Sequence, residues 1–187
     1  MKFIRRYQSD IYGRYRIAYL RDGLFTGLFL AFVVLFMKLI YYPIDVPHTL
    51  YTDLALLAAT LFFAYRYRQR LPEGKVFFKE LMLYGLGLGV VAAAVYGLFL
   101  WLYGGVIDTE FPGRCMKQFV DGELHGNGTP EEKAHTIAVM KTYKTWTWAL
   151  IGAFLTAVMS IMTAFVAALL FRTEKNVVYK KGSKNGS

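Results

Sequence analysis

Four long apolar runs constrain this chain more than any other feature of its sequence. They are Gly23–Tyr41, Leu50–Tyr65, Leu81–Tyr103 and Trp146–Phe171. A transmembrane helix needs roughly 20 predominantly apolar residues, and the runs come close to or exceed that length. Hydrophobic residues make up 56% of the chain and charged residues only 19%, which is unusual for a soluble domain of this size. The runs predict an all-α, polytopic membrane four-helix bundle.

The basic residues, which give the chain a net charge of +9, are concentrated at three places. They lie before the first run, between the second and third runs, and after the fourth run. The link at 42–49 has no basic residue, and the link at 104–145 nearly balances its charges. The positive-inside rule therefore predicts that both termini lie in the cytoplasm. Because these charges border the apolar runs, attraction to anionic lipid headgroups explains them better than nucleic-acid binding.

This topology divides the chain into three parts. Residues 1–22 are basic and rich in tyrosine, which predicts an interfacial amphipathic helix; a binding arm for a cytoplasmic partner is the alternative. Residues 23–171 form the predicted four-helix transmembrane domain. Residues 172–187 form a predicted flexible, basic cytoplasmic tail.

The link between the third and fourth runs predicts an extracytoplasmic helical hairpin at 108–145. Asp108–Glu123 has amphipathic spacing, and Thr129-Pro130-Glu131-Glu132 is a helix-start pattern. We expect the second helix to continue into the fourth run. The aromatic residues Trp101, Tyr103, Trp146 and Trp148 are expected to form the outer aromatic belt.

Small residues recur at every fourth position in three of the runs, which places each set on one helix face. The third run has Gly85, Gly89, Ala93 and Gly97. The first run has Gly23, Gly27 and Ala31, and the fourth has Gly152, Thr156, Ser160, Ala164 and Ala168. Such faces allow helix backbones to approach closely in lipid. We interpret them as internal packing seams; an oligomer interface on the third helix is the alternative.

Two ionisable residues, Lys38 and Asp53, lie inside apolar runs. Their distances from the basic borders place both near the outer leaflet, so we expect an intramembrane polar pair. In a functional interpretation this pair is a proton or ion relay. The alternative is that Lys38 extends its amine to the nearby interface.

The strongest candidates for binding phosphate are the basic residues between the second and third runs. Arg66, Arg68, Arg70 and Lys79 are expected to hold a lipid phosphate at the inner interface. The sequence offers no base or nucleophile beside them, and its histidines lack the spacing of a metal site. No catalytic residue, metal or cofactor is therefore predicted.

Two pairs of motifs resemble domain-of-unknown-function family 4199, small four-helix membrane proteins of Gram-negative bacteria. The first pair is Phe62-Phe63-Ala64-Tyr65-Arg66-Tyr67-Arg68 and Gly74-Lys75-Val76-Phe77-Phe78-Lys79. The second is Ile107-Asp108-Thr109-Glu110-Phe111 and Gly128-Thr129-Pro130-Glu131-Glu132. The resemblance implies a bacterial inner-membrane location and brings no agreed activity. It also suggests a lipid-linked-sugar glycosyltransferase as a partner.

The sequence thus favours a non-enzymatic accessory or scaffold protein of a membrane complex. Its expected partners are anionic membrane lipids and either another membrane protein or a second copy of itself. One alternative is a small oligomeric transporter or channel that uses Lys38 and Asp53. Another is a membrane enzyme that binds a phosphate lipid.

Overall fold

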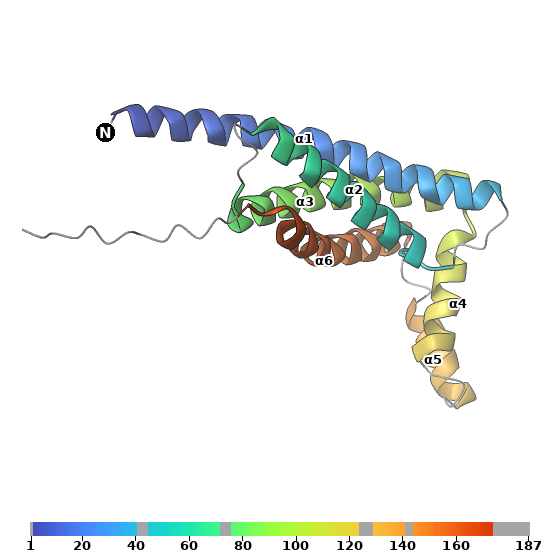
Figure 1. Ribbon diagram of the computed structural model, residues 1–187. Helices are drawn as coiled ribbons and strands as arrows, with labels where there is room; N and C mark the ends of the chain where they lie inside the picture. Colours follow the sequence, from blue (N-terminus) through green and yellow to red (C-terminus); the bar gives the residue numbers. More distant parts are fainter. Residues whose placement is uncertain (1, 41–44, 72–75, 124–128, 141–143, 174–187) are drawn as a thin grey trace, which may run out of the picture.

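The chain is described by a computed structural model at residues 2–40, 45–71, 76–123, 129–140 and 144–173 (Figure 1). Every secondary-structure element within these ranges is helical, which confirms the predicted all-α class. The elements are α1 (Lys2–Leu39), α2 (Leu50–Arg70), α3 (Phe78–Leu102), the π-helical turn η2 (Tyr103–Ile107), α4 (Phe111–Glu123), α5 (Pro130–Met140) and α6 (Thr145–Phe171).

The helices α1, α2, α3 and α6 lie alongside one another and alternate in direction (Figure 1). The helix α3 packs against both α1 and α6, and α2 packs against α1 and α6 from the other side. Within the described ranges, three segments are long and apolar enough to cross a membrane: Ala18–Leu39, Phe78–Ile107 and Thr145–Phe171. The helix α2 is not among them, because charged and hydroxyl residues interrupt its apolar surface at both ends.

The first helix is longer than the predicted boundary at residue 22 allows. It runs without a break over 38 residues, a length of about 57 Å. Its N-terminal half extends past the other long helices (Figure 1). Residues 2–22 of the predicted interfacial segment are therefore helical and continue directly into the first span. The placement of this segment in the membrane interface stays a prediction.

The helices α4 and α5 contact each other and project from one end of the long helices (Figure 1). Thr129 caps α5: its hydroxyl accepts from the Glu132 amide at 3.2 Å, and the Glu132 carboxylate accepts from the Thr129 amide at 2.8 Å. The helix start read from the sequence is therefore confirmed. The predicted continuation into the last span is wrong, because Lys144 has an extended backbone immediately before α6.

The small-residue faces are used for contacts between α3 and its two neighbours. A Cβ atom added at Gly85 would lie 2.6 Å from Ala164 Cβ, and one added at Gly97 would lie 2.8 Å from Ala153 Cβ. On the other side, a Cβ atom at Gly23 would lie 2.7 Å from the Leu88 carbonyl oxygen. Glycine is therefore needed at these positions, because the neighbouring helix occupies the space of a side chain.

Buried hydroxyl groups of α6 are hydrogen-bonded. Thr156 donates to the Gly152 carbonyl at 2.8 Å, and Ser160 donates to the Thr156 carbonyl at 2.7 Å. Thr163 donates to the Ser160 carbonyl at 3.2 Å and lies 3.5 Å from the Thr60 hydroxyl. Because each of these three groups bonds back to its own helix, the polar atoms can be buried without an unsatisfied donor.

The predicted aromatic belt divides into two exposed and two buried side chains. Trp101 is 49% exposed and Trp146 is 53% exposed, and their place at a membrane interface stays a prediction. Tyr103 and Trp148 are buried instead. They belong to the apolar core beneath α4, where Tyr103 packs edge-on against Phe111.

Replacing Gly85 by alanine is expected to lower the free energy of unfolding by about 1–3 kcal/mol, because the new methyl group overlaps Ala164. The matched control is Gly113→Ala in α4, where an added Cβ meets nothing within 4 Å. This control should be neutral or slightly stabilising, because alanine favours a helix over glycine. Thermal unfolding in mild detergent measures the stability of both variants. Equal melting temperatures for the two variants would contradict the described α3–α6 contact.

Candidate functional site

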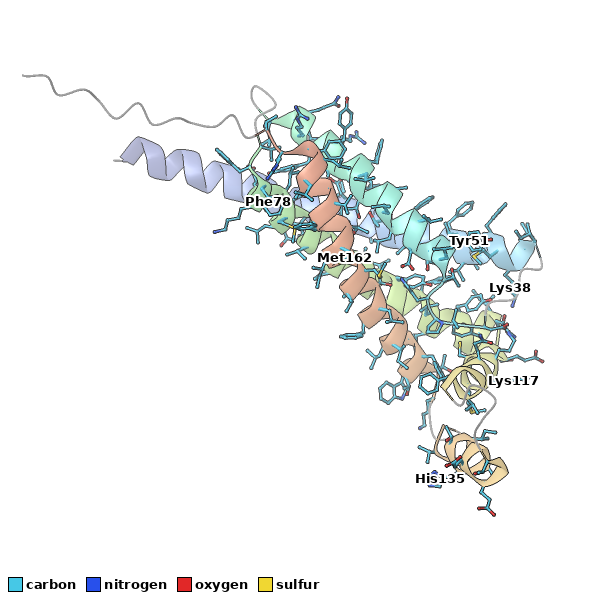
Figure 2. All side chains as sticks on the ribbon, turned by 60° about the horizontal axis from the view of Figure 1, so that its bottom comes forward. Lys38, Tyr51, Phe78, Lys117, His135 and Met162 are labelled. Atoms are coloured by element: carbon cyan, nitrogen blue, oxygen red, sulfur yellow. The ribbon has the colours of Figure 1, made fainter. Side chains whose placement is uncertain are left out.

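The two ends of the long helices differ in charge. We call one the basic end; its described charged side chains are Arg21, Arg66, Arg68, Arg70, Lys79 and Arg172, with Asp22 and Glu80. We call the other the mixed end; its described charged side chains include Lys38, Asp45, Asp53, Asp108, Glu110, Arg114 and Lys144. Figure 2 shows Lys38, Tyr51 and Lys117 toward the mixed end and Phe78 at the opposite end.

At the basic end, three helices converge on the carboxylate of Asp22, which is only 1% exposed. Arg21 of α1 donates to Asp22 Oδ1 through Nε at 3.0 Å and through Nη2 at 2.9 Å. The Tyr84 hydroxyl of α3 donates to Oδ2 at 2.6 Å. Arg70, at the end of α2, places Nη1 3.7 Å from Oδ2. The buried charge thus has the partners that such a group requires.

Two further contacts hold the helices around Asp22 in place. The rings of Tyr67 and Tyr84 stack with centroids 4.3 Å apart, and the Tyr67 hydroxyl donates to Glu80 Oε1 at 2.8 Å. The start of α3 is tied to the end of α6, because the Val76 amide donates to Thr173 Oγ1 at 2.8 Å and the Thr173 amide donates to the Val76 carbonyl at 3.0 Å.

The predicted phosphate-binding residues all lie at the basic end, but they are not equivalent. Arg66 and Lys79 are exposed, Arg68 is half-buried, and Arg70 reaches Asp22. The sequence interpretation missed Arg21 and Asp22 as members of a site. The position of Asp22 at the border of an apolar run could have indicated the site, because a carboxylate there needs a partner.

At the mixed end, Asp108 joins three segments. Arg114 of α4 donates to Oδ1 at 3.1 Å and to Oδ2 at 2.8 Å, and the Tyr103 hydroxyl of η2 donates to Oδ2 at 3.0 Å. Lys38, near the end of α1, places Nζ 2.9 Å from Oδ2 and also donates to the Ile107 carbonyl at 3.2 Å. The network therefore fixes the end of α1 and the start of α4 to η2.

The predicted pair of Lys38 and Asp53 is replaced by two separate contacts. Lys38 pairs with Asp108, which the turn at η2 brings to the end of α1. Asp53 pairs with His48 Nε2, while His48 Nδ1 lies 3.4 Å from the Thr156 hydroxyl of α6. Each residue contacts a partner other than the one inferred from its depth in the membrane. The relay role assigned to them stays a prediction.

The charge network and the burial at the mixed end shift the pKa values of Asp108, Arg114 and Cys115. The Arg114 guanidinium beside Asp108 holds the pKa of that carboxyl well below its usual range. The hydrogen bonds to Asp108 in turn raise the pKa of Arg114. Burial raises the pKa of the Cys115 thiol to about 12. Cys115 is therefore a protonated core residue at neutral pH, rather than a reactive thiol.

The described residues do not include a group of three or more His, Cys, Asp or Glu side chains that could hold a metal ion. His135 lines a shallow hollow on α5 with Glu131, Glu132 and Thr136. His125, the other histidine of this segment, lies outside the described residues.

Replacing Asp108 by asparagine is expected to lower the free energy of unfolding by about 1–3 kcal/mol at pH 7, because charge-assisted hydrogen bonds to Arg114 and Lys38 are lost. The folded-state pKa of Asp108 is depressed, so its stabilisation is complete above the unfolded pKa of about 3.9 and is lost as the pH falls below it. Unfolding in detergent at a series of pH values measures this difference.

The wild-type advantage over Asp108→Asn should stay constant from about pH 7 to about pH 5 and shrink below about pH 4. Glu110→Gln is the matched control, because Glu110 is largely exposed and lies 3.8 Å from Arg114. It should change stability little. Loss of the advantage already near pH 6 would contradict the Asp108 network.

Comparison with protein families gives a match over most of the chain. Residues 21–173 match a family described as "Protein of unknown function (DUF4199)". The matched range begins at Arg21 and ends at Thr173, so it includes both the Asp22 contacts and the tie between α3 and α6. Neither the curated proteins nor the solved structures contain a match to this chain.

Proposed function

We propose that this chain, which belongs to the DUF4199 family, is a non-enzymatic accessory or scaffold protein of a membrane complex. Its three apolar helices are compatible with a membrane protein. The observation that carries the proposal is the combination of a tightly packed helical core with projecting elements at both ends (Figure 1). The core fixes the position of the projections, and the projections are available to other molecules.

The packed core argues against the α3 glycine face as the contact surface. Gly85 and Gly97 face residues of α6, so this face is occupied within the chain. A second copy could use it only by separating α3 from α6. A partner is therefore expected on a different surface.

The helix α4 offers such a surface outside the apolar spans. Its inner side places Phe111, Cys115 and Val120 in the core, which fixes the helix against the rest of the chain. The same helix also exposes the side chains of Phe119 and Lys117. An aromatic side chain on a rigid helix is the kind of residue that anchors a protein contact.

In the proposed placement, α2 is a fourth membrane-crossing helix and the basic end lies in the cytoplasm of a bacterial cell. The support for α2 as a membrane-crossing helix is that its threonines face inward: Thr52 and Thr60 are buried, whereas Leu54 and Phe62 are exposed. The support for the orientation is the excess of arginine and lysine at the basic end.

The alternative functions receive less support. A transporter that uses Lys38 and Asp53 is supported less, because these residues have separate partners rather than each other. A lipid-linked-sugar glycosyltransferase remains the partner suggested by the family resemblance, and it stays a prediction.

A photo-activated crosslinking residue at Phe119 is expected to capture one membrane protein when the chain is produced at native level in its own cells. The matched control is the same substitution at Phe154 of α6, which is also exposed but lies in an apolar span. Crosslinked bands resolved by gel and identified by mass spectrometry give the result. A single discrete adduct from Phe119, absent from Phe154, supports the proposal. Identical patterns from both positions, or no protein adduct from Phe119, contradict it.

A further inference from the structure

We propose that Arg21 and Arg70, held in place by Asp22, form a binding site for the phosphate of an anionic phospholipid headgroup. The site rests on the proposed membrane placement and adds a ligand to it. It differs from the arginine set read from the sequence, because it includes a residue of α1 and a buried carboxylate that positions the arginines.

The charges of this cluster do not cancel. Two guanidinium groups contact one carboxylate, so one positive charge is left over. Asp22 is itself fully engaged, since Oδ1 accepts from Arg21 and Oδ2 accepts from Tyr84. An anion that approaches the cluster therefore meets two cations without meeting a free carboxylate oxygen.

The hydrogen-bonding capacity of Arg21 is only partly used. A guanidinium has five N–H donors in a rigid fork, and Arg21 directs Nε and Nη2 at Asp22. The Arg21 side chain is 50% exposed and the Arg70 side chain is 36% exposed, whereas that of Asp22 is 2% exposed. The carboxylate thus holds the arginines from inside, and their outer edges face the surface. Phosphate oxygens are well matched to this arrangement.

The surface below Arg21 is suited to acyl chains. Leu24, Phe25 and Leu28 follow Arg21 at positions i+3, i+4 and i+7, so they continue its helix face toward the middle of the span. All three are about half exposed. A cation at the border of an apolar helix face fits a lipid, which has a charged headgroup attached to apolar chains. Free inorganic phosphate would use only the upper part of such a site.

The position of the cluster along the helices matches the depth at which a lipid headgroup lies. Arg21 lies near the start of the apolar segment Ala18–Leu39, and Arg70 is the last residue of α2. The described basic residues Lys79 and Arg172 lie near the first residue of α3 and directly after α6. The cluster is therefore at the edge of the apolar spans, where lipid phosphates are found.

The test is a titration of phosphatidylglycerol into the detergent-solubilised full chain, followed by native mass spectrometry. Arg21→Gln and Arg70→Gln are each expected to weaken binding roughly tenfold, because each removes a charge-assisted donor. Arg66→Gln separates this site from the arginine set predicted from the sequence. Arg66 lies on the same helix as Arg70 and is exposed, but the cations that contact Asp22 are Arg21 and Arg70, so binding should change less than about twofold. Thermal melting of each variant shows whether it is folded.

A charge-conserving variant separates a built site from general attraction. Arg21→Lys keeps the charge but lacks the fork that can hold Asp22 and a phosphate together. It should therefore weaken binding nearly as much as Arg21→Gln. Wild-type affinity in Arg21→Lys, or an equal loss in Arg66→Gln, would overturn the site in favour of diffuse attraction. Should Arg21→Gln not fold, Arg70→Gln decides the question against Arg66→Gln.

Inorganic phosphate in excess distinguishes the two sources of the ligand. It should leave bound phosphatidylglycerol in place, because it cannot use the apolar face below Arg21. Displacement by inorganic phosphate would overturn the lipid assignment. If lipid binding fails while the crosslink from Phe119 is preserved, this site is removed and the accessory function stands. If the crosslink fails while lipid binding is preserved, the accessory function is removed and this site stands.

Discussion

The structure depends on the close approach of α3 to α6 and α1. In lipid there is no hydrophobic gain when two apolar helices meet, so contact has to come from backbone packing and polar bonds. Glycines at 23, 85 and 97 make that packing geometrically possible, because a neighbouring helix fills the space of their missing side chains. The same contact places the ends of the long helices in register, which brings the charged residues of separate segments together.

Both ends of this core use a carboxylate to join helices. Asp22 connects α1, α2 and α3 through arginines and a tyrosine, and Asp108 connects α1, η2 and α4 in a similar way. The two differ in their surroundings. Asp22 lies inside a net positive region, whereas the two cations on Asp108 are offset by further carboxylates, because Arg114 also contacts Asp45 and Glu110. This difference explains why the basic end is suited to an anion and the mixed end is suited to fixing α4.

Local patterns in the sequence predicted what depends on local geometry. The helical class and the helix start at Thr129 follow from spacing over a few residues. Contacts between distant residues could not be inferred in this way: Lys38 donates to the Ile107 carbonyl, 69 positions away along the chain, and pairs with the neighbouring Asp108. Depth along a helix limited the possible partners of Lys38 but could not select one, because selection depends on the turn at η2. The continuity of α1 was missed because a change from basic to apolar composition does not break a helix.

The most direct test of the account asks whether α2 crosses the membrane with the other three long helices. Leu50→Cys and Arg66→Cys place exposed thiols at opposite ends of α2, and the native Cys115 is buried. A membrane-impermeant thiol reagent applied to sealed vesicles of one orientation should label only one of the two. Lys117→Cys, on α4, should label from the same side as Leu50→Cys. Labelling of both ends of α2 from one side would contradict the account.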